Sequence, residues 1–213
     1  MGKTFTNADG RIIVDRLIDI IHENREYLSD IDGKIGDGDH GINMDKGFQL
    51  TASRLEEGMG MSDSLKLLGR TLLLEIGGSM GPLYGKYYKA MARESKDAND
   101  ITAAVFADML EAAYAAIRDL GEAKPGDKTI VDTLAPATSA MRKSVDDGLD
   151  LSEALDAMLR AAEAGWKSTE DMVARIGRSS RLGERSRGVL DAGATSCYLM
   201  LKTISETMKE LAV

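Results

Sequence analysis

The sequence predicts an all-α fold of eight antiparallel helices in an up-and-down barrel, and three observations indicate it. Apolar residues recur at helical spacing along nearly the whole chain. Only 3 of the 213 residues are proline, so few positions interrupt helical hydrogen bonding. No segment alternates apolar and polar residues as a half-buried strand does, and the connections are short, which favours antiparallel neighbours. Without a repeat or a linker-like composition break, we expect one domain over residues 1–213.

Four helices are expected in the N-terminal half. The first covers about residues 8–30 and the second about 40–55, each with apolar residues on one helical face. Ser62 is a plausible N-cap for the third, because its hydroxyl can accept a free backbone N–H, and Gly77-Gly78 stops that helix. The fourth runs from Pro82 to about Ser95, since the fixed φ of proline suits the first position of a helix.

Four more helices are expected in the C-terminal half. Asp100 and Ser152 are the predicted N-caps of two of them, because both side chains can accept hydrogen bonds from the first turn. In order, these helices are predicted at residues 100–121, 129–145, 152–177 and 193–211.

Composition excludes several classes of function. The chain has 27 Lys and Arg against 35 Asp and Glu, a net charge of -8, without a basic run or aromatic ladder, so nucleic acid is not expected as a partner. The lone Cys197 rules out an internal disulfide. No apolar stretch approaches the roughly 20 residues that span a bilayer, and residues 1–10 lack the apolar segment of a secretory signal. We expect a cytoplasmic protein with no membrane partner.

The most informative segment is 30–43, which holds four aspartates and four glycines. Carboxylates this close repel one another unless a multivalent cation holds them, and glycines let the chain bend until they converge. No reading frame supplies the oxygen ligands, glycine and closing glutamate of a calcium EF-hand, so the pattern favours magnesium, which shares its coordination shell with phosphates. The alternative is an ordinary Asp- and Gly-rich surface turn.

A second glycine-rich loop, residues 77–85, precedes the predicted fourth helix. Free N–H groups and the positive end of the helix dipole make such an entrance a possible anion site, to which Ser79 adds a hydroxyl. The alternative is a glycine C-cap followed by a tight turn, which accounts for Gly77 and Gly78 but not for Gly81 and Gly85.

The third loop, residues 121–129, nearly matches the Walker A pattern, but Asp127 is one residue too many. Because no strand precedes it, we reject a P-loop. Lys124 and Lys128 could face a phosphate, although solvent-exposed loop lysines are the commoner case, and we expect neither to bind ligand.

The fourth loop, residues 177–188, contains four arginines in an acidic protein. Guanidinium groups pair bidentately with phosphates, which favours a nucleotide over a lone metal. For Arg181 and Arg187 we favour the alternative, a solvated side chain that bridges to surface carboxylates. Asp191 is equally suited to cap the last helix or to hold a ribose hydroxyl.

Together these loops predict a magnesium-nucleotide site on a helical scaffold. Five motifs, at residues 36–44, 77–85, 125–129, 182–186 and 191–196, also resemble in order those of one family. It is the family of ADP-binding L subunits of phosphoenolpyruvate-dependent dihydroxyacetone kinase, equivalent to the C-terminal nucleotide domain of ATP-dependent dihydroxyacetone kinases.

The resemblance implies an eight-helix barrel that binds ADP, or ATP when charged, at one end through two Mg²⁺ ions. Three aspartates would hold the metals: Asp32, Asp37 and Asp39. Further residues match positions that contact the nucleotide: His40, Gly41, Ile42, Asn43, Ser79, Met80, Gly121, Ile130, Arg178, Asp191, Ala192 and Gly193. The chain departs from the family at Met80, where a small hydroxylated residue is common, and at Ile130, where Met is common.

The resemblance also implies a mechanism shared among subunits. This chain supplies no covalent catalytic residue; of its 2 histidines, His22 is expected on the first helix as a surface or packing residue. A phosphohistidine M subunit of the phosphotransferase system would recharge bound ADP, and the phosphate would pass to dihydroxyacetone on a separate K subunit. Two alternatives stay open: the nucleotide subunit of a split ATP-dependent kinase for a related ketose such as erythrulose, and a non-enzymatic nucleotide sensor that binds a regulator.

Overall fold

The computed structural model describes residues 4–212, which contain nine α-helices and one antiparallel pair of two-residue strands. The α-helices are α1 (Arg11–Glu23), α2 (Arg25–Ile35), α3 (His40–Ala52), α4 (Met61–Glu75), α5 (Met80–Ser95), α6 (Ala103–Arg118), α7 (Ile130–Asp146), α8 (Leu151–Ser168) and α9 (Ala192–Leu211). The remaining elements are β1 (Phe5–Thr6), β2 (Asp100–Ile101) and the 3-10 helices η1 (Asn7–Gly10), η2 (Thr169–Asp171) and η3 (Ser179–Ser186). Within residues 4–212, no helix is both long enough and apolar enough to cross a membrane.

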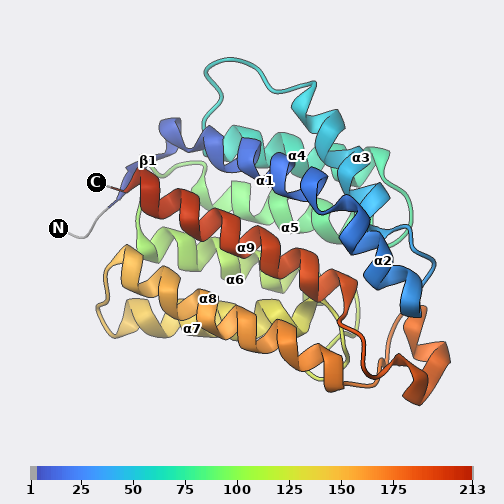
Figure 1. Cartoon of the computed structure of the whole chain (residues 1–213). Helices are drawn as coiled ribbons and strands as arrows, with labels where there is room; N and C mark the ends of the chain where they lie inside the picture. Colours follow the sequence, from blue (N-terminus) through green and yellow to red (C-terminus); the bar gives the residue numbers. More distant parts are fainter. Residues whose placement is uncertain (1–3, 213) are drawn as a thin grey trace.

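The long helices form a closed ring. Each helix from α4 to α9 packs on the next, α9 packs on α1, and α1 closes the ring against α3 and α4 (Figure 1). Buried apolar side chains from α1 through α9 form one hydrophobic cluster inside it. The predicted all-α, up-and-down architecture is therefore confirmed.

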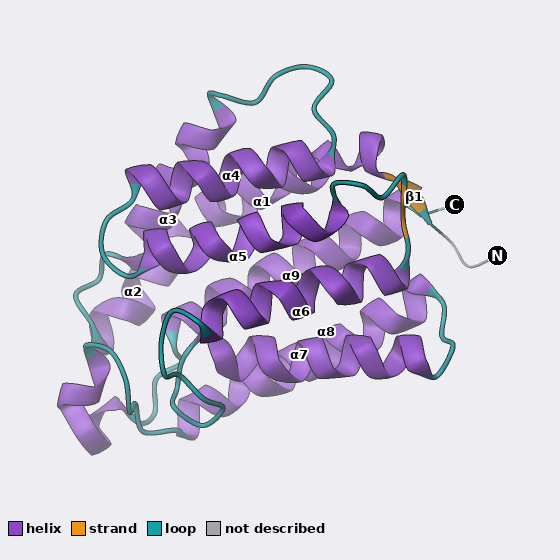
Figure 2. Cartoon of the chain, turned by 180° about the vertical axis from the view of Figure 1, so that it is seen from behind, coloured by secondary structure: helices purple, strands orange, loops and turns teal. Residues whose placement is uncertain are grey.

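Because neighbouring helices alternate in direction, α3, α5, α7 and α9 all begin at the same end of the ring. The strand β1 and the end of α9 lie at the opposite end (Figures 1 and 2). The loops that the sequence singled out therefore gather at one end of the molecule.

The prediction of a single first helix over residues 8–30 was wrong. This segment divides into α1 and α2 at Asn24, whose side-chain amide donates to the Ile20 carbonyl at 2.8 Å. An asparagine side chain that bonds the preceding turn competes with helical continuation. The break lets α2 turn toward α3. His22 Nδ1, at the end of α1, lies 2.9 Å from the buried Asp45 carboxylate of α3, and the exposed His22 side chain is a surface residue, one of the two roles expected for it.

Three predicted caps were also wrong. Ser62 lies inside α4, where its hydroxyl contacts Ser95 at 2.8 Å, and Gly60 precedes the helix. Asp100 lies in β2, and the Thr102 hydroxyl instead caps α6 by accepting the Val105 N–H at 3.2 Å. Asp150 rather than Ser152 caps α8, in a capping box with Glu153. For α6 and α8 a second polar residue stood nearby and forms the cap instead.

Several predicted boundaries moved as well. The α5 helix begins at Met80 rather than Pro82, because proline is tolerated throughout a first turn, where N–H groups have no helical partner. The α6 helix ends at Arg118, not at Gly121. The α8 helix ends at Ser168 rather than near residue 177, and the chain continues through η2 into an irregular segment.

Close helix packing depends on glycine at two positions. A Cβ on Gly69 of α4 would lie 2.8 Å from the Gly85 carbonyl of α5. A Cβ on Gly165 of α8 would lie 2.1 Å from the Asp132 carbonyl of α7, which the missing N–H of Pro136 leaves free of its helical bond. These approaches fix how the helix ends are spaced around the site.

Candidate functional site

A cavity of about 380 Å³ opens at the end of the ring where α3, α5, α7 and α9 begin. Each of these helices contributes the residue before its first turn to the lining: Asp39, Ser79, Thr129 and Asp191. The volume is in the range of small-molecule sites, roughly 300–1,000 Å³. Four helix N-termini direct free N–H groups and the positive ends of their dipoles toward this end, which favours an anion.

Three aspartates meet at one side of the cavity. Asp32 from α2 and Asp37 and Asp39 from the following loop each offer one carboxylate oxygen, and these oxygens all lie within 4.8 Å of one another. Two oxygens on opposite sides of a Mg²⁺ ion are about 4.2 Å apart, twice the usual bond length. The donor set therefore fits magnesium: it consists only of oxygens, nearly at coordination spacing, with room for waters or phosphate.

Glycines make this convergence possible. The Asp39 N–H donates to Asp32 Oδ2 at 3.1 Å, which folds the loop back onto α2. Gly38 has φ +75°, a conformation that L side chains rarely adopt, and a Cβ on Gly36 would lie 2.4 Å from Asp32 Oδ1. Asp39 precedes α3 without capping it through its side chain, so that carboxylate stays free for a ligand.

A cationic side chain lies among these carboxylates. The Arg178 guanidinium contacts the Asp37 carboxylate and lies 3.9 Å from Asp39 Oδ2. Arg178 precedes η3, so the irregular segment after α8 folds over the acidic loop. A guanidinium beside the metal ligands is suited to bind the oxygens of a phosphate held by that metal.

The floor of the cavity is a buried hydrogen-bonded group. His40 Nε2 lies 3.0 Å from the Ser196 hydroxyl, which lies 2.6 Å from the Tyr84 hydroxyl. Burial lowers the pKa of His40 to about 4, so its imidazole is neutral at neutral pH. Burial also raises the pKa of Tyr84, which keeps the phenol protonated. This side of the site can donate and accept hydrogen bonds but adds no charge.

Asp191 has the capping role that the sequence left open. Its Oδ2 accepts the Ala194 N–H at 2.7 Å, at the start of α9. Burial raises the pKa of Asp191 to about 7, although that hydrogen bond acts in the opposite direction. Gly193 keeps this turn compact, since a Cβ there would lie 3.1 Å from Asp191 Oδ2 and 3.5 Å from the Ile130 nitrogen.

One part of the wall is apolar. It is formed by Ile117 and Leu120 at the end of α6, by Ala123 in the following loop, and by Ile130 at the start of α7. Ile130 is 6% exposed. An apolar wall of this kind suits the faces of a flat heterocycle better than a sugar or phosphate.

The structure brings most of the predicted site residues to this cavity. Those that line it are Asp32, Asp37, Asp39, His40, Asn43, Ser79, Met80, Gly121, Ile130, Arg178, Asp191, Ala192 and Gly193. Gly41 and Ile42 do not line it, and their contact with a nucleotide stays a prediction. Helical periodicity turns Ile42 outward, where it is 57% exposed, whereas Gly41 faces α2, where a Cβ would lie 1.9 Å from the Arg25 carbonyl.

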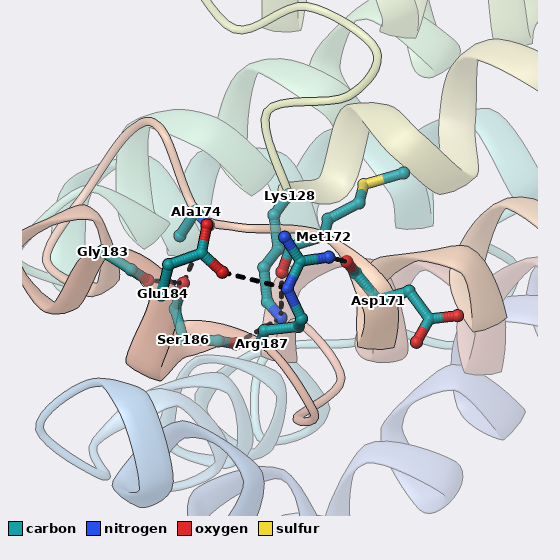
Figure 3. A network of polar contacts seen from close by, with 8 residues as sticks. All are labelled: Lys128, Asp171, Met172, Ala174, Gly183, Glu184, Ser186 and Arg187. Carbon is teal, nitrogen blue, oxygen red and sulfur yellow. Dashed lines mark hydrogen bonds and ion pairs between the residues drawn. The ribbon is translucent and has the colours of Figure 1, made fainter.

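The prediction for Lys128 was also wrong. It is 1% exposed instead of solvated, and it lines the cavity while its ammonium donates to backbone carbonyls (Figure 3). Lys124 is exposed, as expected. Arg187 pairs with the Glu184 carboxylate at 3.1 Å, as predicted, whereas Arg181 is exposed with no carboxylate partner among residues 4–212.

Sequence reasoning missed three polar lining residues in the motifs it had quoted, Tyr84, Lys128 and Thr129. Tyr84 belongs to the predicted glycine-rich loop, and the other two belong to the near-Walker loop. Tyr84 is adjacent to Gly85 and Lys128 is two residues after Gly126, and these glycines were the available signal. The burial of Tyr84 and Lys128 depends on segments far away in the chain, Ser196 for Tyr84 and residues 172–189 for Lys128.

Comparison with known proteins agrees with this geometry. The model of the DAK2 domain matches residues 34–206. The chain is 37% identical over 196 residues to the "PEP-dependent dihydroxyacetone kinase, ADP-binding subunit DhaL" of Escherichia coli, covering 90% of this chain and 92% of that protein. It is 34% identical to the D-erythrulose kinase of Mycolicibacterium smegmatis, over 90% of this chain but 34% of that longer protein.

Solved structures share the fold. The dihydroxyacetone kinase from C. freundii in complex with AMP-PNP and Mg²⁺ superposes with a TM-score of 0.70 at 24% identity. The match covers 97% of this chain and 35% of that kinase, so this chain spans about a third of its length.

Proposed function

Because this chain belongs to the DAK2-domain family, we propose that it is the ADP-binding subunit of a phosphoenolpyruvate-dependent dihydroxyacetone kinase, a phosphotransferase. One observation carries the proposal. A cluster of three carboxylates lies at the point where four helix N-termini converge. Helix N-termini attract anions and carboxylates attract cations, so a polyphosphate bridged to the protein by magnesium satisfies both.

In this proposal Asp32, Asp37 and Asp39 hold two Mg²⁺ ions. When bound, the ions supply the charge neutralisation that phosphoryl transfer requires. The chain's own groups position the nucleotide: Arg178 and the N–H groups at the start of α5 bind phosphate oxygens, and the apolar wall with Ile130 receives adenine. Met80 replaces a hydroxylated side chain, so the hydroxyl in this turn comes from Ser79, which makes no capping bond to α5.

His40 is not suited to act as a general base for a sugar hydroxyl. The lowered pKa of His40 and its bond to Ser196 suit a neutral hydrogen-bonding residue rather than one that cycles through a charged form. We therefore assign sugar binding to a separate K subunit, and the recharging of ADP to the phosphohistidine M subunit of the phosphotransferase system. Both partners would approach the end of the ring where the cavity opens.

The proposal also includes the single domain and the location that the sequence predicts. One continuous hydrophobic cluster from α1 to α9 supports a single nucleotide-binding domain. The cytoplasm is the proposed location, because nucleotides and phosphoenolpyruvate are metabolites of that compartment.

The test is magnesium-dependent nucleotide binding by two aspartate variants. Asp37→Ala should abolish binding of ADP in the presence of Mg²⁺ with helix content unchanged, because one of the three clustered carboxylates is lost. Asp30→Ala is the matched control: Asp30 lies in the same acidic segment but is exposed and outside the cavity. Titration calorimetry and circular dichroism measure both. Binding by Asp37→Ala at wild-type affinity would refute the metal site.

The similarity to D-erythrulose kinase supports a second candidate function, that of the nucleotide subunit of a split ATP-dependent ketose kinase. That enzyme would exchange ADP for ATP in every cycle, whereas the proposed subunit keeps ADP bound. Native mass spectrometry of the purified protein separates the two, since retained ADP with metal favours the proposed function. Phosphate transfer reconstituted with K and M subunits would in turn exclude a purely regulatory nucleotide sensor.

A further inference from the structure

Lys128 is buried beside the cavity in a conformation that is unfavourable for lysine. It is the only residue other than glycine with positive φ, 63°, among residues 4–212, and it is 1% exposed. A left-handed conformation is unfavourable for an L-residue with a side chain, and an unpartnered buried charge is more unfavourable still. Glycine would avoid both costs, so the contacts of the ammonium must compensate for them.

Those contacts are three backbone carbonyls. The Lys128 ammonium donates to the carbonyl of Met172 at 3.1 Å and to that of Ser186 at 2.6 Å (Figure 3). It also donates to the Val189 carbonyl at 2.5 Å. Three acceptors match the three N–H groups of a protonated lysine, whereas a neutral amine would direct its lone pair at one of the carbonyls. No carboxylate forms an ion pair with Lys128 within residues 4–212.

The three carbonyls belong to one stretch of chain, residues 172–189, which we call the anchored segment. It lies between η2 and α9 and has only η3 as regular structure. Two backbone bonds also join it to the rest of the chain: the Arg175 N–H donates to the Asp127 carbonyl at 3.1 Å, and the Gly188 N–H donates to the Glu170 carbonyl at 2.7 Å. Within the segment the Ala174 N–H donates to the Ser186 hydroxyl at 2.9 Å, and Arg187 bonds Glu184 and the Asp171 carbonyl at the surface (Figure 3). Lys128 is therefore a buried side chain that holds this segment at three points, in addition to these backbone bonds.

The anchored segment carries part of the site. Ile176, Gly177, Arg178 and Ser179 line the cavity, and the Arg178 guanidinium contacts the Asp37 carboxylate. Lys128 immediately precedes Thr129, which caps α7. The ammonium thus ties the start of α7 to the segment that places Arg178 beside the acidic cluster.

We propose that Lys128 is a positioning residue for the nucleotide: by holding the anchored segment, its ammonium fixes Arg178 where it meets the metal-bound phosphates. The inference rests on the proposed function. It differs from a general role in stability, because removal of the ammonium should loosen residues 172–189 and weaken nucleotide binding while the helix ring stays closed.

The first experiment compares Lys128→Met with Lys124→Met in the full chain. Methionine keeps most of the aliphatic stem but has no donor, and Lys124 is an exposed lysine of the same loop. By calorimetry with ADP and Mg²⁺, Lys128→Met should bind ten- to a hundredfold more weakly, the range of charge-assisted hydrogen bonds. Lys124→Met should bind as the wild type does. Equal affinities for all three proteins would overturn the proposal.

Hydrogen exchange gives a readout that does not depend on nucleotide. In Lys128→Met the N–H groups of Arg175 and Gly188, which donate to Asp127 and Glu170 in the native protein, should exchange at least tenfold faster. Amides in the middle of α5 and α9 should keep their protection. A uniform loss of protection through all helices would mean a role in global stability and would refute specific anchoring.

A double-mutant cycle tests whether Lys128 acts through Arg178. If it does, Lys128→Met should change the affinity less than about twofold once Arg178→Met is present. Additive losses would contradict the proposal. If Lys128→Met does not fold, Ser186→Ala enters the same cycle, since it removes the bond to Ala174 and leaves the buried charge paired.

The two proposals fail in different ways. Wild-type protein that does not bind ADP with Mg²⁺ would refute the proposed function, and with it a role of Lys128 in binding. Wild-type binding together with an unaffected Lys128→Met variant would refute only the positioning role.

Discussion

Gly41→Ala is expected to damage the metal site although residue 41 does not touch the cavity. Gly41 is the second residue of α3, directly after Asp39 and His40. An added Cβ would lie 1.9 Å from the Arg25 carbonyl and 2.7 Å from the Ser29 hydroxyl, both on α2. To reach an ordinary van der Waals contact of 3.4 Å, the start of α3 must move about 1.5 Å away from α2.

That movement separates the two sides of the acidic cluster. Asp32 belongs to α2, whereas Asp39 immediately precedes α3 and donates its N–H to Asp32 at 3.1 Å. Magnesium accepts bond lengths of about 2.0–2.1 Å with little tolerance, so a shift of this size should weaken metal-dependent ADP binding by about tenfold or more. Overpacking costs roughly 1–3 kcal/mol, and the higher helix propensity of alanine recovers up to about 1 kcal/mol. We expect a net loss of stability of about 0–3 kcal/mol.

The assay is a Mg²⁺ titration of ADP binding, followed by calorimetry, alongside thermal unfolding. Gly33→Ala is the matched control, because its Cβ would find no atom closer than 3.8 Å in the same acidic segment. It should leave binding unchanged and raise stability by about 0.4–1 kcal/mol. Wild-type affinity in Gly41→Ala, or an equal loss in Gly33→Ala, would refute the reasoning.

Three further outcomes follow from the structure. Stability should fall as the pH drops from 6.5 toward 4, because His40 takes up a proton in the unfolded chain before it does so in the folded one. In urea unfolding compared at pH 5 and 7.5, His40→Gln should reduce the difference in stability by up to about 2 kcal/mol, and an unchanged difference would argue against a neutral buried imidazole. Gly165→Ala should lower the melting temperature by several degrees, because the added Cβ would lie 2.1 Å from the Asp132 carbonyl and overpacking costs about 1–3 kcal/mol. An unchanged melting curve would show that α8 can shift without cost. EDTA should release any retained ADP from purified protein, measured by ultrafiltration and chromatography, and ADP that stays bound would mean that binding does not require metal.

The local features of the fold were readable from the sequence. Helical periodicity depends on residues three and four positions apart. It therefore predicted seven of the eight expected helices as single elements. Boundaries were less accurate where two capping residues stood close together, as with Asp150 and Ser152. Asn24 broke a helix that apolar spacing alone would have continued. The two-residue strands β1 and β2 were too short to leave a pattern.

The family was also determined by the sequence, because its motifs are runs of neighbouring residues, and the match to the DAK2 domain confirmed it. The prediction of a cation at the acidic segment followed from residue types alone, because clustered carboxylates repel one another unless a cation holds them. The sequence could not say which residues of those motifs face the ligand. Gly41 and Ile42 lie in the same motif as His40, yet they face α2 and solvent.

Tertiary structure alone decided what meets at the cavity. The alternation of helix direction brings four N-termini to one end, and this depends on ring closure between helices far apart in sequence. Lys128 looked like a solvated loop lysine because its partners, the carbonyls of Met172, Ser186 and Val189, are 44 to 61 residues away. Backbone carbonyls have no residue-type signature, so a buried ammonium that binds three of them can be recognised only when the chain is folded.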